Sequence, residues 1–306
     1  MEMNVITIAL PTGKNLEEQT IALLKDAGIV IGREHPRSYT ATISGLPGLY
    51  EWSARFFKPP QIPSLVCAGP LSDAVVGITG ADALRESPAE VQERVEIYAE
   101  LPYSSKTAGS TRCVLFVRND DRIRDAQDIA QGRGATVAAE YPLETTEWFK
   151  RRGVDVNIEA YTGSVEALVV DRRARFGVAL TETGETLRVN GLREIAEIFR
   201  SSTVLLASRW LDNSTADVVR FLARLLKGTL EARDKVLLLM NAPRDEIDNV
   251  VAMLPSLRSP TVTPLADSGY CSISSVVERG NVNHLIFHLS LRGAEGFIVQ
   301  NISTVM

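Results

Sequence analysis

Short apolar runs alternate with amphipathic segments from the first residues onward, a pattern typical of parallel α/β units. The first unit is a buried strand at Val5–Leu10 and a helix at Asn15–Ala27, closed by Gly28. Further elements of the first block are a short helix at Ile62–Ala68 and strands at Asp73–Thr79, Val95–Leu101 and Arg112–Val117. The chain therefore begins as an α/β fold.

A second set of shorter units follows within the first. It comprises strands at Ala135–Ala138, Val156–Ala160 and Phe176–Leu180, and helices at Leu143–Arg152 and from Val165 to about Arg173. The small, polar segment Ser104–Ser110 predicts one crossing loop, and a second crossing is expected near residue 187, with Ile195–Ser208 returning as strands. The pattern predicts lobe I at 1–103 and 187–230, and an inserted lobe II at 104–186.

The last part of the chain has a different order of elements. Thr215–Arg233 is a strongly periodic helix, and after it come strand Lys235–Met240, helix Arg244–Met253, strand Thr261–Leu265, strand Ser272–Val277, helix Val282–Leu291 and strand Gly296–Gln300. This is the split-βαβ, ferredoxin-like order. We therefore expect a separate small domain at 231–306.

Charge and composition narrow the class of protein. The 306 residues carry a formal net charge of −5, which argues against nucleic acid as a partner because duplex binding requires a basic face. The N-terminus has no signal pattern and no apolar stretch approaches the roughly 20 residues of a membrane span, so we expect a cytoplasmic protein without a membrane partner. His284 and His288 share a helical face, and a helix packed on a sheet is favoured there over a metal site.

The segment Ala179–Leu187 carries the most informative chemistry. A buried strand ends in hydroxyl residues around Gly184, and a helix-like segment follows. Backbone N–H groups at such a turn, the helix N-terminus and the hydroxyls of Thr181, Thr183 and Thr186 together suit a bound phosphate. An ordinary helix cap is the alternative interpretation.

Several segments, in order along the whole chain, resemble ATP phosphoribosyltransferases of the long form. They are DAVVGITGADAL (Asp73–Leu84), YTGSVEA (Tyr161–Ala167), the phosphoribosyl-diphosphate loop TETGETLRVNGL (Thr181–Leu192), its continuation REIAEIFRSSTVLLASR (Arg193–Arg209) and SPTVTPLAD (Ser259–Asp267). The resemblance implies a two-lobed, periplasmic-binding-protein-like catalytic half and a C-terminal ferredoxin-like (ACT-like) regulatory domain.

The resemblance also implies an activity. In this family N1 of ATP displaces diphosphate from phosphoribosyl diphosphate, with Mg²⁺, as the first step of histidine biosynthesis. Histidine binds the C-terminal domain as a feedback inhibitor, and dimers assemble into a hexamer. The transfer passes through an oxocarbenium-like centre, so catalysis depends mainly on positioning and charge stabilisation.

Site residues follow from the same resemblance. The phosphoribosyl-diphosphate loop corresponds to Thr181, Glu182, Thr183, Gly184, Glu185 and Thr186. The catalytic candidates are Glu166, Asp82 and Lys14, and the cations expected at the nucleotide are Arg55, Lys58 and Arg112. Polar contacts to an effector are expected from Ser259, Thr261 and Thr263, with no metal ligated directly by protein.

Several positions depart from the family pattern. Where the family usually carries acidic residues, on the strand before the loop and four residues earlier, this chain has Ala179 and Arg175. Leu239 and Asn241 likewise stand where acidic residues are common near the effector. These departures leave open a paralogue that uses phosphoribosyl diphosphate with another nitrogen nucleophile, or a non-catalytic ligand-binding or regulatory protein.

Overall fold

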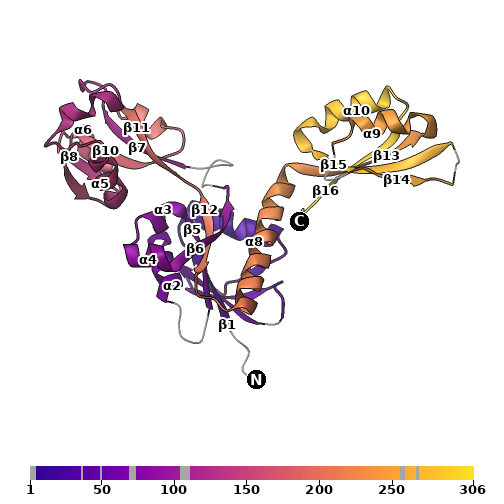
Figure 1. The fold of residues 1–306 in the computed structure, drawn as a ribbon, viewed down its shortest axis with the longest axis horizontal. Helices are drawn as coiled ribbons and strands as arrows, with labels where there is room; N and C mark the ends of the chain where they lie inside the picture. Colours follow the sequence, from indigo (N-terminus) through magenta and orange to yellow (C-terminus); the bar gives the residue numbers. More distant parts are fainter. Residues whose placement is uncertain are drawn as a thin grey trace. The chain divides into compact units, whose positions relative to one another are not determined.

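The computed structural model describes residues 5–35, 37–48, 50–68, 74–103, 111–255, 259–266 and 269–306. Two compact units make up the chain, Met1–Ala223 and Arg224–Met306, and their elements are drawn in Figure 1. Asp73 and the predicted crossing loop at 104–110 lie outside the described residues. The prediction of an α/β catalytic half followed by a ferredoxin-like domain is confirmed.

A seven-stranded mixed sheet underlies lobe I, in the order β2-β3-β4-β1-β5-β12-β6. Its strands are β1 (Val5–Pro11), β2 (Val30–Gly32), β3 (Thr40–Ser44), β4 (Glu51–Phe57), β5 (Ala74–Gly80), β6 (Val95–Leu101) and β12 (Thr203–Ser208). The central strand β1 runs parallel to β4 and β5, and Ile6, Ile8 and Leu10 on it are fully buried. Such a strand is apolar on both faces because helices cover both faces of the sheet.

Short helices complete this lobe. They are α1 (Lys14–Asp26), α2 (Ile62–Ala68), α3 (Ala81–Arg85) and α4 (Ala89–Arg94), with a 3₁₀ turn η1 at Pro59–Gln61. Ile62 and Val66 of α2 pack against Ala9 of β1 on one face of the sheet. Since strand side chains alternate between faces, Ile8 and Leu10 lie on the opposite face.

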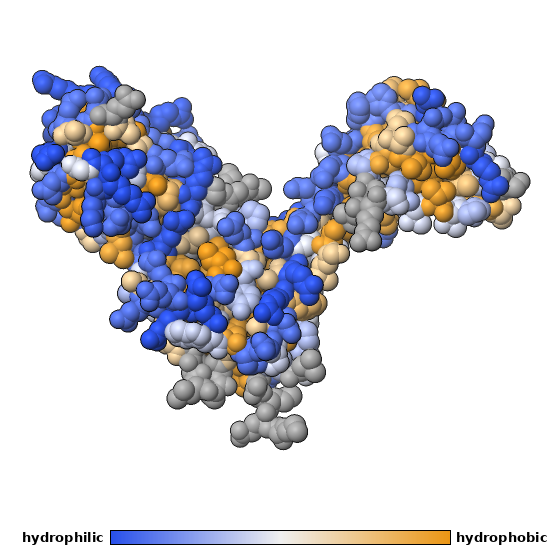
Figure 2. Space-filling model, viewed as in Figure 1, coloured by the Kyte–Doolittle hydropathy of each residue, from blue (hydrophilic) through white to orange (hydrophobic). Residues whose placement is uncertain are grey.

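A five-stranded sheet forms lobe II, in the order β11-β7-β10-β8-β9. Its elements are β7 (Thr111–Arg118), η2 (Ala126–Gly132), β8 (Thr136–Ala139), α5 (Pro142–Lys150), β9 (Asn157–Ala160), α6 (Val165–Val170), β10 (Phe176–Thr181), α7 (Glu185–Val189) and β11 (Leu192–Ser201). One core packs Phe149 against Phe176, and a second, on α6, gathers Val165 with Phe116. Polar residues dominate the visible face of this lobe (Figure 2).

The second crossing between the lobes differs from the prediction. β11 pairs antiparallel with β7 and belongs to lobe II, so the chain returns to lobe I at Ser202, between β11 and β12. The expectation that the chain crosses to lobe I near residue 187 is therefore wrong, because β11 still belongs to lobe II. Only Ser202 separates β11 from β12. Because both strands are apolar, the sequence pattern does not show that they belong to different sheets.

The C-terminal unit is an antiparallel sheet with two helices, in the order β14-β15-β13-β16. Its elements are β13 (Lys235–Pro243), η3 (Arg244–Glu246), α9 (Ile247–Met253), β14 (Thr261–Pro264), β15 (Tyr270–Glu278), η4 (Arg279–Asn281), α10 (Val282–Ser290) and β16 (Glu295–Asn301). Val236, Leu238 and Met240 pack with Val250 and Leu289 of the two helices.

Helix α8 (Asn213–Arg233) contains the border between the two units. Its first turn is capped by Asp212, whose carboxylate accepts hydrogen bonds from the Thr215 N–H at 3.0 Å, the Thr215 hydroxyl at 2.6 Å and the Ser214 hydroxyl. These bonds, the Ser214 bond first, lower the pKa of Asp212 to about 2. No helix of the described chain is long and apolar enough to cross a bilayer.

The cap gives a prediction about stability and pH. Asp212→Ala removes the acceptor and should lower the free energy of unfolding by about 1 kcal/mol at pH 7. Because folding lowers this pKa, the ionised cap stabilises the fold above the usual aspartate pKa, and that stabilisation is lost as pH falls through about 2. Asp212→Asn keeps a capping oxygen and should flatten this part of the acid profile in urea unfolding. An identical profile for wild type and Asp212→Asn would contradict the assignment.

Candidate active site

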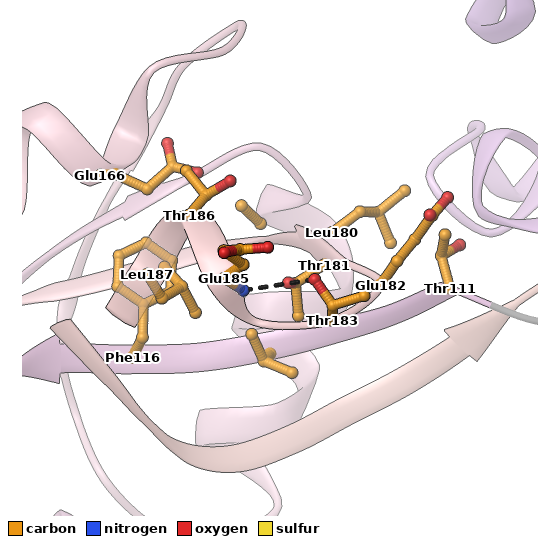
Figure 3. A pocket seen from close by; sticks show the side chains of 12 residues that line it. Thr111, Phe116, Glu166, Leu180, Thr181, Glu182, Thr183, Glu185, Thr186 and Leu187 are labelled. Atoms are coloured by element: carbon orange, nitrogen blue, oxygen red, sulfur yellow. Dashed lines mark hydrogen bonds between the residues drawn. The ribbon is translucent and has the colours of Figure 1, made fainter. Parts of the chain in front are cut away.

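A pocket of about 320 Å³ opens at the carboxyl end of β10, where the sequence predicted an anion site. Figure 3 shows Glu166 and Thr186 at one end of the pocket and Glu182 and Thr111 at the other. Of the predicted residues, the structure brings together Thr181, Glu182, Thr183, Glu185, Thr186 and Glu166. The pocket is thus lined by hydroxyls and carboxylates from one strand-to-helix turn and from α6.

The turn after β10 is held by its own hydroxyls. Thr181 Oγ1 accepts the N–H of Gly184 at 3.0 Å. Thr183 Oγ1 accepts the N–H of Glu185 at 3.4 Å, the bond drawn as a dashed line in Figure 3. Gly184 adopts a left-handed conformation with φ of 72°, which a residue without Cβ accepts at little cost. Because α7 has five residues, few peptide dipoles are aligned behind the turn. The loop N–H groups and hydroxyls therefore matter more than the helix charge that the sequence suggested.

Gly184 lies beside the carboxylate of Glu194. A Cβ at Gly184 would meet Glu194 Oε1 at 2.7 Å, so this position has no room for a side chain unless the carboxylate moves. That carboxylate receives two hydrogen bonds from the Arg112 guanidinium, at 2.7 and 3.0 Å, and these bonds raise the pKa of Arg112. Arg112 is the register partner of Thr181, the last residue of β10. A bidentate ion pair thus supports the floor of the loop.

A second carboxylate stands behind Glu166. Glu140 follows β8 and accepts hydrogen bonds from the backbone N–H groups of Leu180, near the end of β10, and of Gly163, in the connection before α6. Burial, and then the negative charge of Glu166, raise the pKa of Glu140 above its usual value. The sequence did not single out Glu140, although its place after a buried strand was a usable signal.

The two departures from the family pattern lie in different places. Ala179 lines the pocket and is 4% exposed, so no acidic side chain reaches the pocket from that position. Arg175 turns to another side, where its guanidinium forms two 3.0 Å hydrogen bonds to Asp121 and one of 2.8 Å to the carbonyl of Gln131. The charge reversal at Arg175 therefore does not act inside the pocket.

Asp82 lies at the junction of the lobes and does not line this pocket. Its carboxylate accepts hydrogen bonds from the hydroxyls of Ser201, at the end of β11, and of Tyr141, the latter at 3.1 Å. Burial first, and then Asp82, raise the pKa of Tyr141. Nearby Glu86 accepts the N–H of Leu143 at 2.6 Å, at the start of α5. Helix α3 of lobe I is thereby bonded to two elements of lobe II.

The remaining predicted residues do not line this pocket. Arg55 on β4 and Lys58 before η1 are exposed, and Lys14 is the first residue of α1, with a side chain outside the described set. Ser259, Thr261 and Thr263 are exposed, the last two on the edge strand β14. Their predicted roles stay predictions.

Comparison with known proteins decides the family. A family model described as ATP phosphoribosyltransferase matches residues 58–228, and one described as HisG, C-terminal domain, matches residues 232–304. The chain belongs to the ATP phosphoribosyltransferase family. The predicted family, and with it an enzyme of the glycosyltransferase type, is confirmed.

Relatives of this transferase align along its whole length. An ATP phosphoribosyltransferase of Nitratidesulfovibrio vulgaris (strain DSM 19637 / Miyazaki F) is 36% identical over 99% of both chains. One of Geotalea uraniireducens is 33% identical over 96% of this chain and 97% of the relative. The solved ATP phosphoribosyl transferase (HisG:HisZ) complex from Thermotoga maritima covers 74% of this chain and 98% of its own, with a TM-score of 0.57 and 24% identity, a likeness of fold.

The paired carboxylates give a prediction about charge in the pocket. Since folding raises the pKa of Glu140, its contribution favours the folded state at acid pH and is lost as the pH rises through the raised value. Glu166→Gln removes the neighbouring charge, so the pKa of Glu140 should fall and stability should decline less between pH 4 and 8. Carboxyl-carbon NMR titration, assigned with Glu140→Gln, and urea unfolding would measure both effects. Glu185→Gln, in the same pocket, is the matched control, and an equal shift in it would contradict the pairing.

Proposed function

We propose that this transferase joins phosphoribosyl diphosphate to N1 of ATP with release of diphosphate, opening histidine biosynthesis. The observation that carries the proposal is the loop after β10, where hydroxyls and backbone N–H groups surround a left-handed Gly184 at the edge of a 320 Å³ pocket. Backbone N–H groups and hydroxyls at such a turn are the usual partners of a phosphate. Family membership along the chain supports the same conclusion.

The loop is proposed to hold the 5′-phosphate. Thr181 and Thr183 accept hydrogen bonds from the loop N–H groups, and a phosphate oxygen could take their place while the hydroxyls rotate to donate. Glu166, at the end of the pocket where Thr186 lies, can accept hydrogen bonds from ribose hydroxyls. Holding the sugar at both ends would orient its reactive carbon for in-line displacement.

The residues present fit Mg²⁺ that is carried by the diphosphate. Within the described parts of the chain, no group of three His, Cys, Asp or Glu side chains could hold a metal ion alone. Mg²⁺ usually keeps several waters when substrate phosphates bind it, and the carboxylate of Glu166 suits a hydrogen bond to a metal-bound water. Bound there, the ion would neutralise charge on the leaving diphosphate.

The acceptor, the effector and the assembly are further parts of the proposal. Lys14, Arg55 and Lys58 are proposed as cations for the ATP phosphates, since lobe I supplies them away from the phosphate loop. Histidine as an inhibitor at the C-terminal unit, a homo-oligomer from dimer to hexamer, and a cytoplasmic location are proposed from the family alone.

The test is an assay of the purified full chain with phosphoribosyl diphosphate, Mg²⁺, ATP and a diphosphatase, following the ultraviolet absorbance of N1-phosphoribosyl-ATP. Thr183→Ala with Gly184→Ala should abolish product, because the loop loses a hydroxyl and its left-handed turn is strained. Thr146→Ala with Gly153→Ala repeats both changes in lobe II outside the pocket and should stay active. Tight binding of phosphoribosyl diphosphate without product would favour a transferase that uses another nitrogen nucleophile. If the protein neither forms product nor binds phosphoribosyl diphosphate, both enzyme hypotheses fail and a ligand sensor remains.

The Arg112–Glu194 pair generates a separate prediction about positioning. If the pair acts through the loop, Arg112→Ala and Glu194→Ala should each raise KM for phosphoribosyl diphosphate by about 10- to 150-fold and leave KM for ATP nearly unchanged. The double variant should resemble either single variant, because the two residues act as one unit. If Arg112 instead contacts the nucleotide, only its own variant should raise KM for ATP.

A further inference from the structure

Helix α10 of the C-terminal unit carries two histidines one turn apart. Nε2 of His284 lies 3.0 Å from Nε2 of His288, and the ring centroids are 4.3 Å apart. The sequence favoured a helix packed on its sheet at this place, and the helix does pack there, through Val282 and Leu289. His284 is exposed and His288 half-buried, so the packing of the helix on its sheet encloses neither ring.

This separation matches two ligands of a single metal ion. With metal–nitrogen bonds of about 2.0–2.1 Å, nitrogens at a right angle lie about 2.8–3.0 Å apart, whereas a tetrahedral angle requires about 3.3–3.4 Å. Near-right angles are the preference of tetragonal Cu²⁺ and of Ni²⁺, and imidazole suits both ions. We propose that His284 and His288 form an exposed binding site for a divalent late transition metal such as Cu²⁺ or Ni²⁺.

Metal binding requires only a change of tautomer in one imidazole ring. Without metal, one Nε2–H donates to the other Nε2; with metal, both rings carry their proton on Nδ1 and both Nε2 lone pairs bind the ion. Among the described residues no third His, Cys, Asp or Glu joins the pair, so water fills the remaining coordination positions. The site is therefore exchangeable rather than structural.

The surroundings permit access and substitution. Apolar surface is visible over the helices of this unit in Figure 2. Phe287, which precedes His288 in the sequence, is 59% exposed. The buried contacts of α10 come from Val282 and Leu289, with Leu285 and Ile286 partly buried beside them. Replacing either histidine should leave the fold intact. The site belongs to the C-terminal unit and is independent of the transfer proposed above.

The experiment uses the full chain without a histidine tag, titrated with Ni²⁺ by calorimetry in a non-coordinating buffer. One ion per chain is expected. His284→Ala and His288→Ala should each weaken binding on the order of 100-fold, because the second ligand loses its effective concentration. His35→Ala removes the remaining histidine of the sequence and should change nothing.

A spacing control tests the geometry itself. Asn283→His combined with His284→Asn keeps three histidines but turns one ring about 100° around the helix, away from His288. This variant should bind as weakly as His284→Ala, with an unchanged circular dichroism spectrum and melting temperature. Absence of Ni²⁺ binding to the wild type, or equal binding by the wild type and the spacing variant, would overturn the proposal.

Discussion

The loop after β10 of this transferase is constrained by the close approach of Gly184 and the carboxylate of Glu194, which leaves no room for a Cβ. This approach is possible because the loop residue has no side chain and because Arg112 holds the carboxylate by two hydrogen bonds. An unpaired carboxylate beneath the loop would repel the phosphate that we propose to bind there, and the two hydrogen bonds from Arg112 offset that charge. Three strands meet here, since Arg112 lies on β7, Glu194 on β11, and the loop continues β10.

The same strand arrangement joins the pocket to the rest of the catalytic half. β11 carries Glu194 near its start and ends at Ser201, whose hydroxyl bonds to Asp82 of lobe I. Asp82 also receives the Tyr141 hydroxyl of lobe II. A carboxylate of lobe I that was expected at the reacting centre is thus hydrogen-bonded by two residues of lobe II at the junction. These bonds suit a role for Asp82 in fixing how the two lobes meet, separate from the phosphate binding that we propose for the loop.

The sequence predicts a feature of the site when its residues are neighbours in the chain, and misses it when only the folded sheet brings them together. The loop Thr181–Thr186 could be predicted, because its turn residues directly follow a buried strand. The Arg112–Glu194 pair could not, since 82 residues separate its members and only strand register brings them together. Strands β2 and β3 were missed because they are largely exposed and lack an apolar run. Adjacent strands β11 and β12 were merged because hydrophobicity does not record which sheet a strand joins.

Ala179, where the family usually has an acidic residue, lies beside another acidic residue at the same edge of the sheet. Parallel strands end together, and β8 runs beside β10 with Ala139 opposite Val178, so Glu140 follows next to Ala179. An acidic group missing from one strand end is therefore present on its neighbour, held by the backbone N–H groups of Leu180 on β10 and Gly163 before α6, with burial, and then the charge of Glu166, raising its pKa. Two close carboxylates still favour a cation arriving with a diphosphate, which is what the transfer requires.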